Sequence, residues 1–259
     1  MTRKLCLHWM LGIAWMAVVA SASADEFRVE SEIFVGNQTE PIAGNLTLFS
    51  SGLVYDFPRM GPKEITVFDP ARGRFVLLDP RRKVKTTVTT QELLELAAAM
   101  KVHARDVEGA FASAANPNFD QHMDDESGWL TLSSPSLTYR AQCIVPQLPS
   151  AVARYRGFAD WYARLNATRP GSLPPFARME LDRAISERGK VPSEVELTVE
   201  PERKFVGRKL VVRSKHLFNW RLSNTDRQQI EKAGTYMADF QAVSVSSYRE
   251  SLDQLVGSR

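Results

Sequence analysis

The chain has 259 residues, of which 44% are hydrophobic and 24% are charged, and its formal net charge is +3. A chain of this length can bury a substantial core as one large domain. A charge so close to neutral argues against nucleic acid as a partner, because phosphate binding depends on concentrated positive charge.

The first 24 residues have the pattern of an export signal. Arg3 and Lys4 form a positive start, the run Leu5–Ala20 is apolar, and the small residues at 21–24 suit cleavage before Asp25. An uncleaved membrane anchor is the alternative, but sixteen apolar residues fall short of the ~20 that a spanning helix needs. We therefore expect one domain over residues 25–259, exported to the periplasm or secreted, with no transmembrane segment after signal cleavage.

Cysteine is sparse, with Cys6 in the signal and only Cys143 beyond it. An exported chain with one cysteine has no internal disulfide, so packing must supply its stability. Cys143 lies in the strand-like run Leu137–Val145 and is interpreted as a buried, inert thiol. An exposed thiol that pairs with another chain is the alternative.

The region after the signal has the patterning of strands. Apolar and charged residues nearly alternate over Phe27–Val35, which is typical of a half-buried strand. Asn45–Ser50 and Leu53–Phe57 are the next expected strands, and Ser51-Gly52 between them is a tight-turn signal.

Glu64–Val88 is the most regular stretch of the chain. Its two Asp-Pro pairs, at 69–70 and 79–80, suit type I turns, since Asp can accept from a following amide and Pro presets φ. They separate strands expected at Ile65–Phe68, Phe75–Leu78 and Lys83–Val88. Six short strands with short connections predict an antiparallel meander over residues 26–88, with Phe75–Leu78, which is apolar on both faces, as a central strand.

Helices and strands alternate in the rest of the chain. Thr89 and Glu92 match a capping box, so a helix is predicted over Thr90–Lys101. The later patterns predict a helical segment over 89–118, a hairpin over 128–145, a helical insertion over 150–189, returning strands over 193–222 and a C-terminal helix over 224–256. The predicted fold class is α+β, with a long antiparallel β-sheet, helices packed across one face and a C-terminal helix.

One candidate ligand site is an aromatic stripe on the predicted helical insertion. Its members recur every three or four residues and are Tyr155, Phe158, Trp161 and Tyr162. The stripe would line a pocket for an apolar ligand, and the alternative is that it is ordinary core.

A second candidate is a set of basic residues near the two Asp-Pro turns, which cluster if the strands pair as a meander and would then form a docking patch for anionic headgroups or an acidic partner. Its members are Arg72, Arg74, Arg81, Arg82, Lys83 and Lys85. The alternative is that these charges keep sheet edges and turns soluble, with Asp69, Asp79 and Glu64 diluting the positive field.

Signatures of catalysis and of metal or cofactor binding are missing from the sequence. The acidic run Asp120–Glu126 fits neither an EF-hand nor a zinc spacing, and we interpret it as a solvated loop without metal. No nucleophile elbow is present, and the histidines after the signal, His103, His122 and His216, have no triad context. We expect no cofactor and no catalytic residue, although carboxylates that meet only in three dimensions would escape this reasoning.

A family resemblance adds to this interpretation. It rests on the run Arg74–Val88 and on the proline-led strand Val191–Leu197 after the helical insertion. With this order of elements, the chain resembles uncharacterised exported bacterial proteins and, more distantly, the LolA-like half-barrel superfamily of periplasmic lipoprotein carriers. The resemblance implies a curved sheet around an apolar cavity under helices, used to carry or sense acyl chains.

Three functions follow as hypotheses. The first is an exported, non-enzymatic binding protein with an apolar or lipid ligand between sheet and helices. The second is a structural or adaptor protein of the cell envelope, with a filled core and a protein partner. The third is a metal- or carboxylate-dependent hydrolase.

Overall fold

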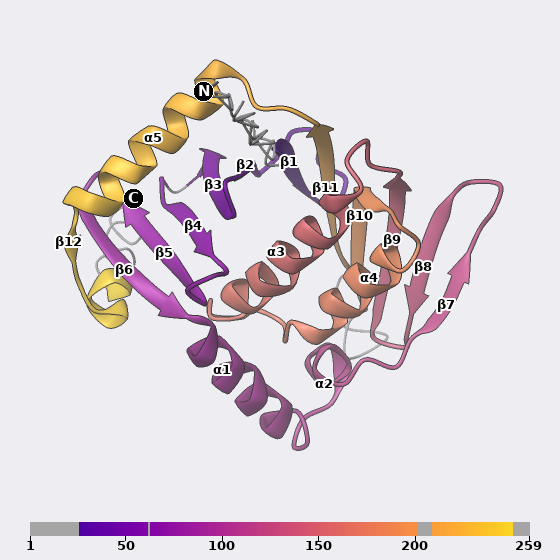
Figure 1. Ribbon diagram of the computed structural model, residues 1–259. Helices are drawn as coiled ribbons and strands as arrows, with labels where there is room; N and C mark the ends of the chain where they lie inside the picture. Colours follow the sequence, from indigo (N-terminus) through magenta and orange to yellow (C-terminus); the bar gives the residue numbers. More distant parts are fainter. Residues whose placement is uncertain (1–25, 62, 201–208, 251–259) are drawn as a thin grey trace, which may run out of the picture.

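The computed structural model describes residues 26–61, 63–200 and 209–250, so the predicted export signal lies outside it. The protein is α+β, as predicted. Its strands form a 12-stranded, mostly antiparallel open sheet in the order β12-β6-β5-β4-β3-β2-β1-β11-β10-β9-β8-β7. The sheet curves around α3 and α4 in a long arc (Figure 1).

The predicted six-strand meander is confirmed. In the turn between its second and third strands, Ser51 and Gly52 have φ of 49° and 79°, the pair of positive values that a tight two-residue hairpin requires. The strands are β1 (Phe27–Val35), β2 (Ala43–Ser50), β3 (Leu53–Met60), β4 (Ile65–Asp69), β5 (Arg74–Asp79) and β6 (Val84–Thr89).

The other half of the sheet returns to the meander through β11, which pairs antiparallel with β1. Our prediction of a solvated loop over Asp120–Glu126 was wrong for its first four residues, which form an edge strand against β8. The strands of this half are β7 (Asp120–Met123), β8 (Trp129–Ser133), β9 (Leu137–Ile144), β10 (Val191–Val199) and β11 (Leu210–Asn219).

Four helices lie on the concave side of the sheet (Figure 1). The predicted capping box of the first is present, with the Thr89 hydroxyl accepting from the Glu92 amide and the Glu92 carboxylate accepting from the Thr89 amide. These helices are α1 (Thr90–His103), α2 (Gly109–Ala115), α3 (Ser150–Asn166) and α4 (Phe176–Ser186).

The C-terminal segment differs from the single helix predicted over 224–256. The helix α5 (Asn224–Asp239) stops at Phe240, whose backbone is extended, and the chain continues as the short strand β12 (Gln241–Ala242). Pairing parallel to β6 ends the helix, because the Gln241 and Val243 amides donate to main-chain oxygens of Lys83 and Lys85.

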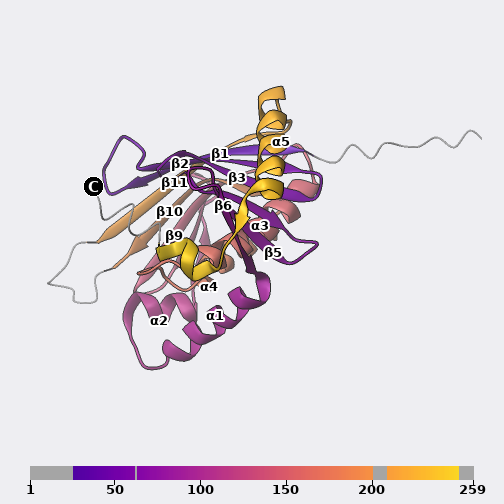
Figure 2. The same ribbon diagram turned by 90° about the vertical axis from the view of Figure 1, so that its left-hand side faces the viewer.

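The helices cover both faces of the sheet, not one. On the concave face, α3 packs against Phe68 and Leu77, whereas α5 packs against Val67 and Val76 on the convex face. Figure 2 shows α5 standing apart from α1, α2 and α4. The strand β5 is buried from Phe75 to Asp79 because both of its faces are covered, not because it is central, since it is third from one edge.

Candidate functional site

The aromatic stripe of α3 is part of a packed core. Phe158 lies 5.7 Å from Phe49 and 6.3 Å from Phe68 between ring centroids, and Tyr155 lies 5.3 Å from Phe218. Trp161 and Tyr162, the other two members of the stripe, are partly buried against this same cluster. Rings of the sheet therefore enclose Tyr155 and Phe158 in the manner of core side chains.

Tyr162 also has a polar role. Its hydroxyl donates to Asp56 on β3 at 2.8 Å, and the same buried carboxylate accepts from Thr47 at 2.7 Å and from Asn45. Burial raises the pKa of the Asp56 carboxyl, and the three hydrogen bonds counter that rise. Asp56 thus ties α3 to the sheet.

The six predicted basic residues do not form one patch. They flank turns at opposite ends of β5, because consecutive hairpins of a meander turn at opposite ends of the strand they share. A strand of six residues separates its ends by roughly 17–20 Å. Arg72 and Arg74 lie at one end, and Arg81, Arg82 and Lys83 lie at the other.

Most of these cations have internal partners. Arg72 and Arg74 both face Asp69, at 3.0 and 3.5 Å, and Arg82 pairs with Asp79 at 2.7 Å. The Lys85 ammonium donates to main-chain oxygens of Met237 and Ala238 at the end of α5. Lys83 is exposed and has a φ of 54° within its turn.

The acidic segment has no metal-site geometry. Asp124 caps the β7–β8 turn by accepting from the Glu126 and Ser127 amides. Within the described ranges, no group of three His, Cys, Asp or Glu side chains is placed to hold a metal ion. Burial raises the pKa of the Cys143 thiol to about 11, so this thiol is protonated at neutral pH.

His216 lies on the concave face of the sheet between two serines. Its Nδ1 is 2.9 Å from the Ser31 hydroxyl and its Nε2 is 3.0 Å from the Ser214 hydroxyl. Burial, together with the nearby cation of Arg178, lowers the pKa of His216 to about 3, so the ring is neutral at neutral pH. With both ring nitrogens on hydroxyls, the ring lacks the orienting carboxylate of a Ser-His-Asp triad.

A groove lies on the opposite, convex face of the sheet, between α5 and the ends of β3, β4 and β5, and we call it the α5 groove. Its volume is about 360 Å³, which falls in the range of small-molecule sites. Phe57, Ile65 and Ala233 form its buried apolar floor. The ten lining residues are Phe57, Pro58, Lys63, Ile65, Pro80, Arg81, Gln229, Lys232, Ala233 and Tyr236.

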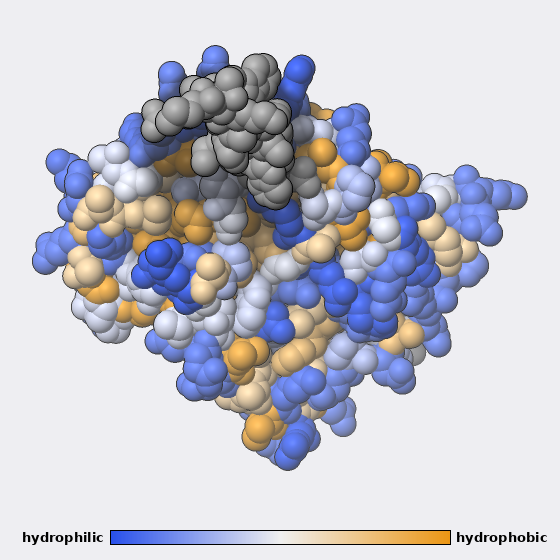
Figure 3. Space-filling model, in the orientation of Figure 1, coloured by the Kyte–Doolittle hydropathy of each residue, from blue (hydrophilic) through white to orange (hydrophobic). Residues whose placement is uncertain are grey.

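The sequence builds the helical wall of this groove by spacing. Gln229, Lys232, Ala233 and Tyr236 recur at i, i+3, i+4 and i+7, so they share one face of α5. In Figure 3, which has the orientation of Figure 1, hydrophobic side chains lie between α5 and the strands beneath it, with hydrophilic side chains around them.

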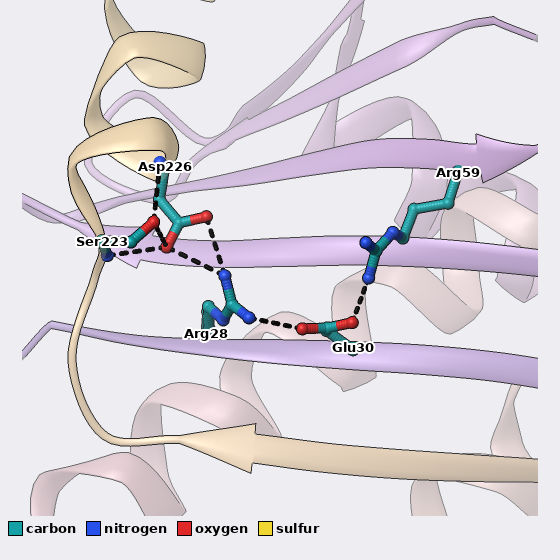
Figure 4. A network of polar contacts seen from close by, with 5 residues as sticks. All are labelled: Arg28, Glu30, Arg59, Ser223 and Asp226. Atoms are coloured by element: carbon teal, nitrogen blue, oxygen red, sulfur yellow. Dashed lines mark hydrogen bonds and ion pairs between the residues drawn. The ribbon is translucent and has the colours of Figure 1, made fainter.

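Both ends of α5 are fixed to the sheet. At its start, Asp226 accepts from the Ser223 amide and hydroxyl at 2.8 Å and from Arg28 on β1 at 3.2 Å, and Arg28 connects through Glu30 to Arg59 (Figure 4). At its end, Lys85 caps the last carbonyls. The groove therefore lies under a helix that is held at both ends.

All the charged residues that line the α5 groove are basic. Lys63, Arg81 and Lys232 are exposed at its rim, and none of the ten lining residues is acidic. Among the ion pairs of the described residues, none involves these three cations. The Lys232 ammonium lies 5.7 Å from the centroid of the Tyr236 ring.

Comparison with known proteins shows no family. No protein-family model matches the chain, and a sequence search of curated proteins gives no match. In the part of the chain that the structure describes, no helix is both long and apolar enough to cross a bilayer. The LolA-like relationship stays a prediction.

Sequence reasoning missed the α5 groove because its residues come from segments far apart in the chain. The lining residues of β3 and β4, the Pro80-Arg81 turn and α5 meet only when α5 crosses the convex face. One available signal was the spacing of the apolar and basic residues along α5. Nothing in that spacing tells which face of the sheet the helix covers.

Proposed function

We propose that the protein is an exported, non-enzymatic binding protein that holds an apolar, lipid-like chain in the α5 groove. The observation that carries this proposal is a groove of about 360 Å³ with a buried apolar floor between a helix and a sheet. Such apolar concave sites with a few polar groups are the usual form of small-molecule sites.

The site of this proposal differs from the aromatic stripe of α3. Tyr155 and Phe158 are enclosed by neighbouring rings, which favours a filled core on the concave side. The α5 groove, by contrast, has unfilled volume and an exposed rim. An apolar chain in the groove would be covered by α5 on one side and by the sheet on the other.

Displacement of a fluorescent acyl probe from the purified protein tests this function. A Gln229→Trp variant would place a large ring in the groove, because Gln229 is a partly buried lining residue. We expect this variant to lose probe affinity by about tenfold or more, since the ring occupies the volume that the chain needs.

Gln228→Trp is the matched control, because Gln228 is the exposed neighbour on the same helix and is not part of the lining. It should bind the probe as the unmodified protein does, and circular dichroism should show both variants folded. Equal affinity in both variants would contradict the proposed site. Complete lack of probe binding, with a protein partner recovered instead, would favour an envelope adaptor.

A further inference from the structure

We infer that the α5 groove selects a fatty acid, a single-chain amphiphile with an acidic headgroup, over neutral lipids of the same length. This inference rests on the proposed function and adds the identity of the head. It follows from the exclusively positive charge at the rim of the groove.

Two features of the groove divide it into a chain site and a head site. The floor residues Phe57, Ile65 and Ala233 are buried and apolar, so they suit methylene groups. The rim cations Lys63, Arg81 and Lys232 are exposed, so they can contact a charged group that stays in water.

The rim cations differ from the other cations of this region. Arg82, in the same turn as Arg81, is held by Asp79 at 2.7 Å, and Lys85 donates to carbonyls of α5. The three rim cations, by contrast, have no acidic side chain in the groove lining to neutralise their charge. Three cations around an apolar mouth give a field that favours an anion at that position.

The size of the groove restricts the ligand to one chain. A volume of about 360 Å³ is near the lower end of the ~300–1,000 Å³ that small-molecule sites have. A diacyl lipid would leave its second chain in water, at a cost that grows with each exposed methylene. A fatty acid instead places one chain on the floor and its carboxylate at the cations.

The test compares dodecanoate with dodecanol, which share a chain and differ in the head, by isothermal titration at neutral pH. We expect dodecanoate to bind more tightly to the unmodified protein. Single variants Lys63→Gln, Arg81→Gln and Lys232→Gln should each weaken dodecanoate binding about two- to fivefold, the range of exposed ion pairs. Dodecanol binding should not change in these variants.

Lys83→Gln is the matched control, because Lys83 is exposed in the same turn as Arg81 but does not line the groove. It should leave both affinities unchanged, and added salt should weaken dodecanoate binding only. Equal binding of acid and alcohol, unaffected by the rim variants, would overturn the headgroup inference and leave the proposed function standing. Failure of both ligands to bind would overturn the proposed function and this inference together.

Discussion

At the scale of single residues, the partly exposed side chain of His216 lies between the sheet and α3. His216 is neutral and hydrogen-bonded to Ser31 and Ser214, with Tyr155 of α3 against its ring at 6.5 Å and the cation of Arg178 nearby. Because burial and Arg178 lower its pKa to about 3, the unfolded chain binds a proton at His216 before the folded protein does.

The contribution of His216 to stability should therefore fall as the pH drops from about 6.5 to about 3, since His216 holds more protons in the unfolded state there. For the step from about pH 7 to about pH 4 we expect His216 to contribute a loss of about 2 kcal/mol, a value discounted for its partial exposure. Urea unfolding at both pH values should show a smaller loss in His216→Gln.

The control for this prediction is His122→Gln, because His122 is exposed on the edge strand β7. Asp160 acts in the opposite direction: burial and the neighbouring Asp182 raise the pKa of its carboxyl to about 6, so the folded state protonates first as the pH falls. Only the difference between the unmodified protein and His216→Gln therefore reports on His216. If His216→Gln lost as much stability between the two pH values as the unmodified protein does, the role of His216 would be refuted.

At the scale of elements, the sequence predicted the end of a helix or strand correctly where a turn or a capping residue marks that end. The two Asp-Pro turns lie at the predicted positions, with Asp69 accepting from the Arg72 amide and Asp79 from the Arg81 amide. The strand β7 was missed because Asp-Gln-His-Met has no apolar alternation and is held only by pairing with β8. The end of α5 was missed for a related reason, since pairing with β6 stops it.

The start of α5 gives a prediction at this scale. Asp226 is buried, closes the capping box with Ser223 and binds Arg28. Asp226→Ala should lower the free energy of unfolding by about 2–3 kcal/mol, because it breaks the capping box with Ser223 and leaves the Arg28 guanidinium without this carboxylate. Chemical unfolding measures this loss. Arg59→Ala, at the exposed end of the same network, should lower the free energy of unfolding by less than about 1 kcal/mol. Similar losses in the two variants would contradict the prediction that the buried end of the network contributes more.

At the scale of the whole molecule, the sequence could not tell which face of the sheet each helix covers. Both α3 and α5 have apolar stripes, and β4 and β5 are buried on both faces, so local patterns allow either placement. The face that α5 covers decides where the candidate ligand site forms. With α5 on the convex face, the groove forms there, and the concave side is left to the aromatic core.

Because β5 contributes alternate residues to the two cores, the cores should unfold together. Leu77 belongs to the concave core and Val76 to the convex core beneath α5. Leu77→Ala should lower the free energy of unfolding by about 3 kcal/mol and Val76→Ala by about 2 kcal/mol. In each variant, tryptophan fluorescence and far-ultraviolet circular dichroism should report one shared transition. Thr87→Ala, at the exposed position of β6 that pairs with Val76, should leave that transition within about 0.5 kcal/mol. If Val76→Ala split off an early transition, α5 would be a separately unfolding strap over an otherwise intact sheet.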